Sequence, residues 1–246
     1  MKSTLIVRWR RVVQLLSLSL FIVMGGVLGV AVVGGWAIGE PFGMLQVALA
    51  AQGFTLGMVV SLVALLVIGM LLGRFFCGWL CPFGNLIEFI GGVNPRKLPV
   101  HRIVREAGWL KHSVLGATVV SSLAIGAPAF CLVCPARGVC GFAAGNTLGV
   151  APTATLGFVL LTSTVYLSRF WCRYLCPLGS LLSILGRFSP IRLVRKEGCT
   201  DCGLCERACP MGLTVKDMGR RHPDCLVCGE CVDSCPKGLL QVEVGR

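Results

Sequence analysis

The sequence predicts a mainly α-helical membrane protein, in which a four-helix transmembrane bundle with a parallel internal repeat precedes a small α+β module rich in cysteine. Three observations predict this fold: long apolar segments, a repeated segment of 25 residues and two cysteine runs near the C-terminus. Hydrophobic residues make up 55% of the 246 residues, charged residues make up 14%, and the mean hydropathy is +0.80. Because soluble domains carry about 25% charged residues, this composition favours a membrane protein.

Four uncharged segments are long enough to cross about 30 Å of hydrocarbon. They cover residues 12–33, 55–73, 113–130 and 154–170. A helix in a soluble core rarely lacks charge on all sides, since its outer face meets water. The first segment follows a basic N-terminus, as a signal peptide would, but its apolar part is longer than the usual 7–15 residues. We therefore expect four retained transmembrane helices, with residues 1–190 forming the membrane domain.

The positive charges predict the orientation of that domain. Of the 23 Lys and Arg residues, only Arg137 falls in a loop on the far side of the expected crossings. Because cytoplasmic loops carry the excess of Lys and Arg, both termini are expected in the cytoplasm, with the chain in a prokaryotic cytoplasmic membrane. A basic collar facing anionic lipid explains the net charge of +12, so a nucleic-acid partner is not expected.

The C-terminal module, residues 191–246, contains two runs of the form C-x-x-C-x-x-C-x-x-x-C-P. In bacterial ferredoxins the first three cysteines of such a run bind one [4Fe–4S] cluster, and the cysteine before proline binds the other cluster. The expected ligands are Cys199, Cys202, Cys205 and Cys235 for the first cluster, and Cys225, Cys228, Cys231 and Cys209 for the second. A zinc site needs only two C-x-x-C pairs and would leave the remaining cysteines and both prolines unexplained.

The internal repeat relates residues 74–98 to residues 169–193 without gaps, at an offset of 95 residues. Eleven of the 25 aligned positions are identical, and each copy contains the motif C-x-x-x-C-P. An even number of expected crossings separates the copies, so the two copies should leave the membrane on the same side. This arrangement is a parallel repeat with a pseudo-two-fold axis along the membrane normal.

The repeated motif predicts a third metal site. Residues i and i+4 share one face of a helical turn, so each copy offers two thiols. Together the copies supply four cysteines, as a [4Fe–4S] cluster requires: Cys77, Cys81, Cys172 and Cys176. Two alternatives stay open, namely a redox-active thiol pair in each copy and simple packing of small buried residues.

Three further cysteines, Cys131, Cys134 and Cys140, follow the third apolar segment and are expected on the outward face. They could form a disulfide with one thiol left over, or three ligands of an open-sided outward-face cluster. We favour the metal site, because the C-x-x-C-P sequence here is similar to a shortened ferredoxin run.

In their order along the chain, the apolar segments, the two C-x-x-x-C-P motifs and the two ferredoxin runs resemble the NapH/MauN/NosR-type family of membrane polyferredoxins. The resemblance implies an electron-transfer subunit of a quinol dehydrogenase, NapH-like, rather than a stand-alone catalyst. It also implies quinone and other iron–sulfur or catalytic redox subunits as partners, besides the lipid bilayer. Only the motif cysteines carry these roles over: Cys77, Cys81, Cys172, Cys176 and the eight ferredoxin cysteines.

Function is therefore expected to be electron transfer between the quinone/quinol pool and a redox partner complex. The alternative is a membrane-bound maturation or assembly factor that uses its clusters to reduce a metal or disulfide in a client protein. Nucleotide-binding, hydrolase and haem-attachment motifs are absent from the sequence. No catalytic residue can be assigned from the sequence, because the redox chemistry belongs to the cofactors.

Overall fold

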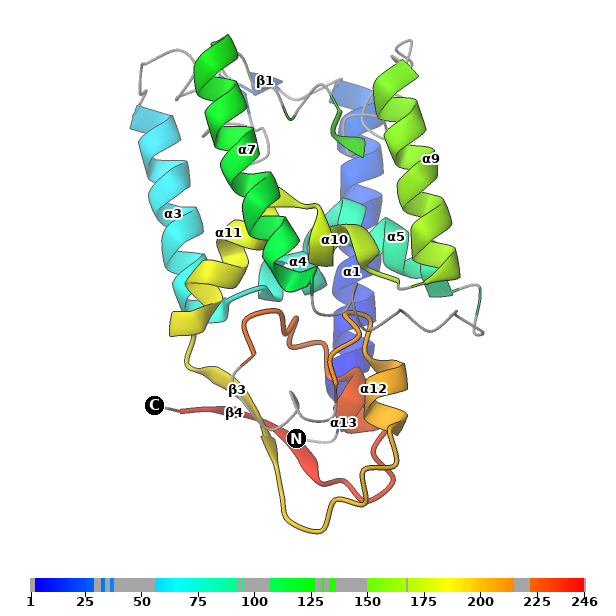
Figure 1. The fold of residues 1–246 in the computed structure, drawn as a ribbon. Helices are drawn as coiled ribbons and strands as arrows, with labels where there is room; N and C mark the ends of the chain where they lie inside the picture. The colour runs from blue at the N-terminus through cyan, green and yellow to red at the C-terminus, as the bar shows by residue number, and fades with distance from the viewer. Residues whose placement is uncertain are drawn as a thin grey trace.

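The fold has three levels: upright long helices, a belt of short helices, and a cysteine-rich module at one end (Figure 1). A computed structural model of the chain describes residues 3–28, 32–33, 36–37, 56–92, 94, 107–126, 130, 133–135, 150–166, 168–214 and 222–245. The candidate metal sites lie in the belt and in the module, so these two levels matter most for function.

Four long helices fall where the sequence predicts apolar segments. They are α1 (Ser3–Leu28), α3 (Leu56–Leu72), α7 (Leu110–Ile125) and α9 (Val150–Val165), and Figure 1 shows them standing beside one another. Helix α7 ends at Gly126, whose φ of 65° is the left-handed conformation that favours glycine at a helix C-terminus.

The prediction of a transmembrane bundle is wrong for this structure. Among the residues described, none of the helices is both long and apolar enough to cross a membrane. Helices α3, α7 and α9 have 17, 16 and 16 residues, and at 1.5 Å per residue they extend only about 24 to 26 Å. The apolar sequence continues past α3, but a turn at Gly73 and Arg74 ends that helix. The predicted orientation of the termini depended on the same crossings.

The short helices of the belt come from the two copies of the repeat. The first copy forms α4 (Phe75–Trp79) and α5 (Pro82–Gly92), and the second forms α10 (Phe170–Tyr174) and α11 (Pro177–Leu185). In each copy the motif proline begins the second helix, where its missing N–H costs no hydrogen bond. Each second helix packs against one long helix that precedes the first copy and one that lies between the copies. Helix α5 packs against α1 and α9, and α11 packs against α3 and α7.

The C-terminal module combines a hairpin with two short helices. Strands β3 (Ile191–Arg195) and β4 (Leu240–Val244) pair antiparallel, and α12 (Leu204–Ala208) and α13 (Glu230–Asp233) lie between them in sequence. The remaining elements are β1 (Val32–Val33), β2 (Trp36–Ala37), η1 (Ala107–Trp109) and η3 (Gly186–Phe188).

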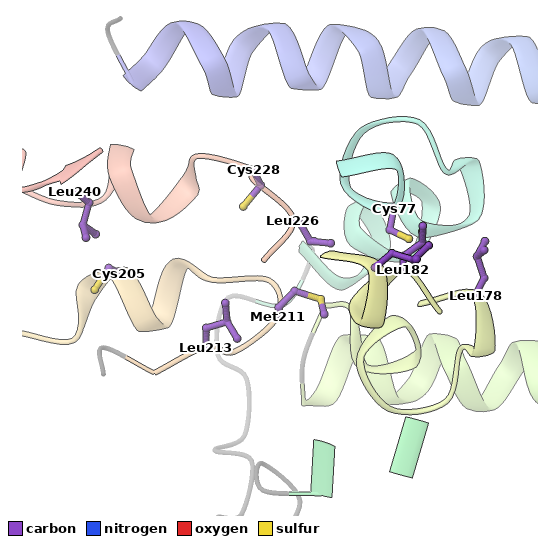
Figure 2. Packing of buried hydrophobic residues seen from close by; sticks show 10 residues of the cluster. Cys77, Leu178, Leu182, Cys205, Met211, Leu213, Leu226, Cys228 and Leu240 are labelled. Carbon is purple, nitrogen blue, oxygen red and sulfur yellow. The ribbon is translucent and has the colours of Figure 1, made fainter. Parts of the chain in front are cut away.

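One continuous hydrophobic core joins the module to the belt. Figure 2 shows Leu226 and Met211 between Cys228 of the module and Cys77 of the first repeat copy. Both bridging side chains are almost fully buried, at 2% and 1% exposed. The module is therefore packed onto the repeat rather than tethered by a linker.

Several basic residues expected in a solvated or lipid-facing collar are in fact buried. This group consists of Arg10, Arg74, Lys111, Arg169 and Arg173, each at most 6% exposed. Because a buried charge is costly unless it is paired, the partners of these residues become part of the site description.

Candidate iron–sulfur sites

The first predicted ferredoxin ligand set lies together in the structure. Cys199, Cys202, Cys205 and Cys235 all line one cavity, beside Leu240 of β4. Cys199 and Cys202 are exposed, whereas Cys205 is buried. This cavity is at the end of the module that faces away from the repeat.

The second predicted ligand set lines a different cavity, next to the repeat. Cys209, Cys225, Cys228 and Cys231 share its wall with Gly73 and Arg74, where the first repeat copy begins. Burial raises the pKa of Cys209 and of Cys225 to about 11 and that of Cys228 to about 12. Because iron binds the thiolate, these groups would release protons when a cluster binds.

The two ferredoxin runs have matching backbones around their cavities. Asp201 and Val227, each just before the second cysteine of a run, have positive φ of 48° and 53°. Gly203 and Gly229 follow the second cysteines with φ of 73° and 80°. A β-branched residue such as Val227 rarely adopts this conformation. Here it directs the Val227 N–H to the sulfur of Cys225 at 3.5 Å, and such hydrogen bonds to sulfur suit an iron–sulfur ligand.

The repeat cysteines also come together, although they are far apart in sequence. Cys77, Cys81, Cys172 and Cys176 line one small cavity, walled by Phe83, Phe130 and Trp171. Cys77 and Cys172 are buried, and the other two cysteines are partly exposed. The donor set is four thiols with apolar neighbours, which fits an iron–sulfur cluster.

In the third cysteine group, the structure describes Cys134, and it does not lie apart from the repeat cysteines as expected. Cys134 is buried and lines the same cavity as the four repeat cysteines. The sequence argument placed it on the opposite face because it assumed a full membrane crossing between them. Cys131 and Cys140 lie outside the described residues.

The two copies treat their second cysteine in the same way. The N–H of Gly84 donates to the sulfur of Cys81, and the N–H of Gly179 donates to the sulfur of Cys176, both at 3.4 Å. Each sulfur thereby receives a donor from the first turn of the helix that follows it. N–H groups at a helix start stabilise negative charge, such as the charge on a sulfur that binds iron.

Two buried arginines hold the copies together. Each arginine donates hydrogen bonds to the cysteine-containing turn of the other copy. Arg74 of the first copy donates to the carbonyl oxygens of Cys172 and Gly179, at 2.7 and 2.9 Å. Arg169, its equivalent in the second copy, donates to the carbonyl oxygens of Cys77 and Gly78. Equivalent residues of the two copies therefore make equivalent contacts across the interface between the copies.

Each arginine is neutralised by a carboxylate, but the carboxylates have different origins. Arg169 pairs with Glu88 of α5, which also pairs with Arg10 of α1. Burial alone would raise the pKa of Glu88, but the guanidiniums of Arg169 and Arg10 outweigh burial and lower that pKa. Glu88 therefore stays ionised inside the protein.

The second copy has Ser183 where the first has Glu88, so its carboxylate comes from the module. Asp224, next to Cys225, pairs with Arg74 at 3.0 Å and also with Lys111 of α7. Ser183 donates to the same Asp224 oxygen at 3.0 Å. Burial would raise the pKa of Asp224, but Arg74 and Lys111 hold it below its usual range. The module thus completes the charge balance of the repeat.

The turns between the repeat cysteines touch the second ferredoxin cavity directly. A Cβ atom on Gly78 would lie 2.8 Å from the carbonyl oxygen of Leu226, so only glycine fits there without a shift. Trp79 donates to the carbonyl oxygen of Val227 at 3.3 Å. In the second copy Arg173, which aligns with Gly78, donates to the carbonyl oxygen of Met211. Both copies therefore contact the chain close to the ligands of the second set.

Sequence reasoning missed the charged residues of this site. Arg74 and Arg169 are identical in the aligned repeat, so the alignment itself could have identified them. Asp224 and Lys111 gave no such pattern, because their pairing depends on how the module packs. Across the part of the chain that the structure describes, no three Cys, His, Asp or Glu residues form a group that could hold a single metal ion.

Comparison with known proteins agrees with this division of the chain. A family described as "4Fe-4S binding domain" matches residues 54–101 and 148–196, once for each copy of the repeat. A second family, "4Fe-4S dicluster domain", matches residues 198–240. No solved structure matches the chain.

The named relatives include ferredoxin-type proteins. The chain is 32% identical to the methylamine utilization ferredoxin-type protein MauN of Methylorubrum extorquens over 218 residues, covering 81% of this chain and 73% of MauN. It is 24% identical to the ferredoxin-type protein NapH of Haemophilus influenzae, covering 82% and 74% of the two chains. Similarity to YccM of Escherichia coli, at 33% identity, covers 63% of this chain and 46% of YccM.

The chain belongs to the NapH/MauN/NosR family. It is a ferredoxin-type iron–sulfur protein of electron transport, and its cysteine-rich domains bind [4Fe–4S] clusters. This confirms the sequence resemblance. The chain spans less than half the length of YccM.

Proposed function

We propose that this member of the NapH/MauN/NosR family carries electrons through three clusters in a row. The observation that carries the proposal is the order of the thiol sets along one continuous core. The set containing Cys205 lies at the far end of the module, the set containing Cys228 lies next, and the set containing Cys77 lies in the repeat (Figure 2).

The residues between the sets support electron exchange between neighbours. Gly78 lies close to Leu226, since a Cβ atom added to Gly78 would collide with it, and the two residues directly follow Cys77 and Cys225. Each cluster supplies one-electron chemistry when bound, and the protein fixes the spacing and the surroundings. Arg74 and Arg169 each share their carboxylate with a second cation, Lys111 or Arg10, so positive charge exceeds negative charge beside the repeat site and favours a more reduced state there.

The partners that we propose are a quinone/quinol, a lipid bilayer and a further redox protein. Large apolar side chains are exposed on three long helices: Val60, Leu71, Val120, Leu123, Phe158 and Leu161. Extended exposed apolar surface of this kind marks an interaction site, and lipid is the partner that matches its composition. We place the chain at a prokaryotic cytoplasmic membrane, where a lipid-soluble quinol would reach it. A redox partner would exchange electrons at the exposed Cys199 and Cys202.

Cluster counting tests the proposal. The full chain, reconstituted anaerobically, should bind about twelve irons and twelve sulfides, four of each per cluster. The double variant Cys77→Ser with Cys172→Ser removes one ligand from each copy and should lower the iron content by about four. The EPR signals of the two ferredoxin clusters should persist, which shows that the variant folds.

The same preparation in lipid vesicles, mixed with a reduced quinol, should show reduction of its clusters. An unchanged iron content in the double variant would remove the shared repeat cluster from the proposal. Absence of reduction by quinol would leave the three clusters in place and remove only the quinone.

A further inference from the structure

We propose that Cys134 is a fifth thiol of the repeat site, able to replace a repeat cysteine as ligand to the cluster. The inference rests on the proposed repeat cluster and adds a residue from outside both copies. Cys134 lines the cavity together with Cys77, Cys81, Cys172 and Cys176. It is 7% exposed, close to the 5% and 6% of Cys77 and Cys172, so it is enclosed to the same degree as the ligands themselves.

Contacts of the residues just before Cys134 hold this part of the chain beside the cavity. Phe130 packs against Trp171, the residue before Cys172, with ring centroids 6.2 Å apart. Val133 is held by α9, because the hydroxyl of Thr155 donates to its carbonyl oxygen at 2.9 Å. The N–H of Val133 closes a turn onto the carbonyl oxygen of Phe130 at 3.2 Å. The surrounding chain therefore fixes the position of the Cys134 thiol.

Local sequence makes Cys134 equivalent to the second cysteine of each copy. Cys81, Cys134 and Cys176 are each followed directly by proline. Pro135 is almost completely buried, as is Pro177. The site thus offers three Cys-Pro thiols and two thiols one helical turn earlier, from three separate segments of chain.

Five thiols exceed the need of one cubane, in which each of four irons takes one protein ligand. One thiol is then held in reserve beside the cluster. If a ligand is lost, the fifth thiol can take its iron, because thiolates exchange at iron without a change in the cluster's composition. The reserve should therefore protect the repeat site against the loss of one cysteine but not of two.

Single and double serine variants of the full chain test this. Cys81→Ser should keep the iron content of the unmutated protein, with a shifted EPR signal for the repeat cluster alone. Cys134→Ser should also keep its iron. The double variant Cys81→Ser with Cys134→Ser leaves three thiols and should lose about four irons.

A matched control combines Cys81→Ser with Val133→Ala, which changes an exposed neighbour of Cys134 and removes no second thiol. This control should keep its iron. The inference is overturned if Cys81→Ser alone loses four irons, or if the double variant without Cys134 keeps them. Persistent ferredoxin signals in every variant exclude misfolding as the cause. Failure of the proposed repeat cluster would instead appear as unchanged iron in Cys77→Ser with Cys172→Ser.

Discussion

The ferredoxin module and the repeat site both gather four or more thiols around a cavity, but they do so in different ways. In the module the first three cysteines of each set lie within seven residues of chain, and only the fourth comes from the other run. In the repeat the two cysteine pairs are 95 residues apart and meet only through tertiary packing. Local backbone geometry therefore forms the first kind of site, and buried charge assembles the second.

The charged residues around the two regions also differ, in keeping with local formation of one site and tertiary assembly of the other. The cavity of Cys199 and Cys202 opens to solvent, and its neighbours Arg195 and Asp201 are exposed charged residues. The repeat cavity is flanked by two buried guanidiniums, each paired with a carboxylate. These directed polar contacts join segments that are distant in sequence, and we infer that they help to fix the register between the halves of the repeat site.

The largest expected effect tests the crossed ligands of the module. Cys209 belongs to the first run in sequence, but it lines the cavity of the second set. Cys209→Ser should therefore disrupt the cluster of Cys225, Cys228 and Cys231 and lower the iron content by up to about four. Iron analysis with EPR measures the loss. Cys205→Ser is the matched control and should affect the other cluster. The comparison fails if both variants alter the same signal.

An intermediate effect tests the charged clasp of the repeat, by which we mean the two buried arginines, Arg74 and Arg169, with their contacts to the opposite copy. Arg169→Met removes the guanidinium between Glu88 and the cysteine turn of the first copy. Because Glu88 then lacks one of its two cations inside the protein, the free energy of unfolding should fall by about 3–5 kcal/mol. Denaturant titration followed by circular dichroism measures this.

The control is Arg192→Met. Arg192 is 42% exposed and 3.8 Å from Glu243, so its loss should cost at most about 1 kcal/mol. Equal losses in the two variants would mean that the clasp contributes no more than a surface ion pair, and the distinction between the two regions would then rest on geometry alone.

Sequence reasoning succeeded where chemistry depends on local spacing. The eight module cysteines line two cavities in the sets that the run spacing predicts, and the repeat alignment located the four cysteines of the third cavity. Each of the four apolar segments contains most of one long helix, although Gly73 and Arg74 turn the chain before α3 becomes long enough to cross a membrane. Hydropathy reports apolar composition, and it does not report where a turn ends a helix.

Sequence reasoning failed where a residue's role depends on a distant partner. Arg10 and Lys111 were interpreted as part of a basic collar facing lipid, whereas they pair with carboxylates from residues 78 and 113 positions away in sequence. Cys134 was expected apart from the repeat cysteines because the topology assumed straight crossings, but it lines their cavity. Burial and pairing of this kind are set by tertiary packing, which a single sequence does not contain.

The smallest expected effect sharpens the comparison by testing the symmetry of the repeat itself. Gly84 and Gly179 occupy equivalent positions, and a Cβ atom on either would lie 2.7 or 2.6 Å from an arginine nitrogen of the clasp. It would also lie 3.0 Å from the carbonyl oxygen of Cys77 in the first case and 2.8 Å from that of Cys172 in the second. Alanine at each position should therefore displace an arginine and a cysteine turn together.

We expect Gly84→Ala and Gly179→Ala each to lower the free energy of unfolding by about 1–3 kcal/mol, with the larger loss at Gly179 because its backbone contact is closer. Gly92→Ala is the control: Gly92 also lies on α5, and a Cβ there would meet nothing within 4 Å. This change should be neutral or stabilise the helix by up to about 1 kcal/mol. Denaturant titration of the three variants compares them. If Gly84→Ala proved as harmless as Gly92→Ala while Gly179→Ala did not, the two clasps would be unequal, and the site would depend mainly on Arg74 and the module.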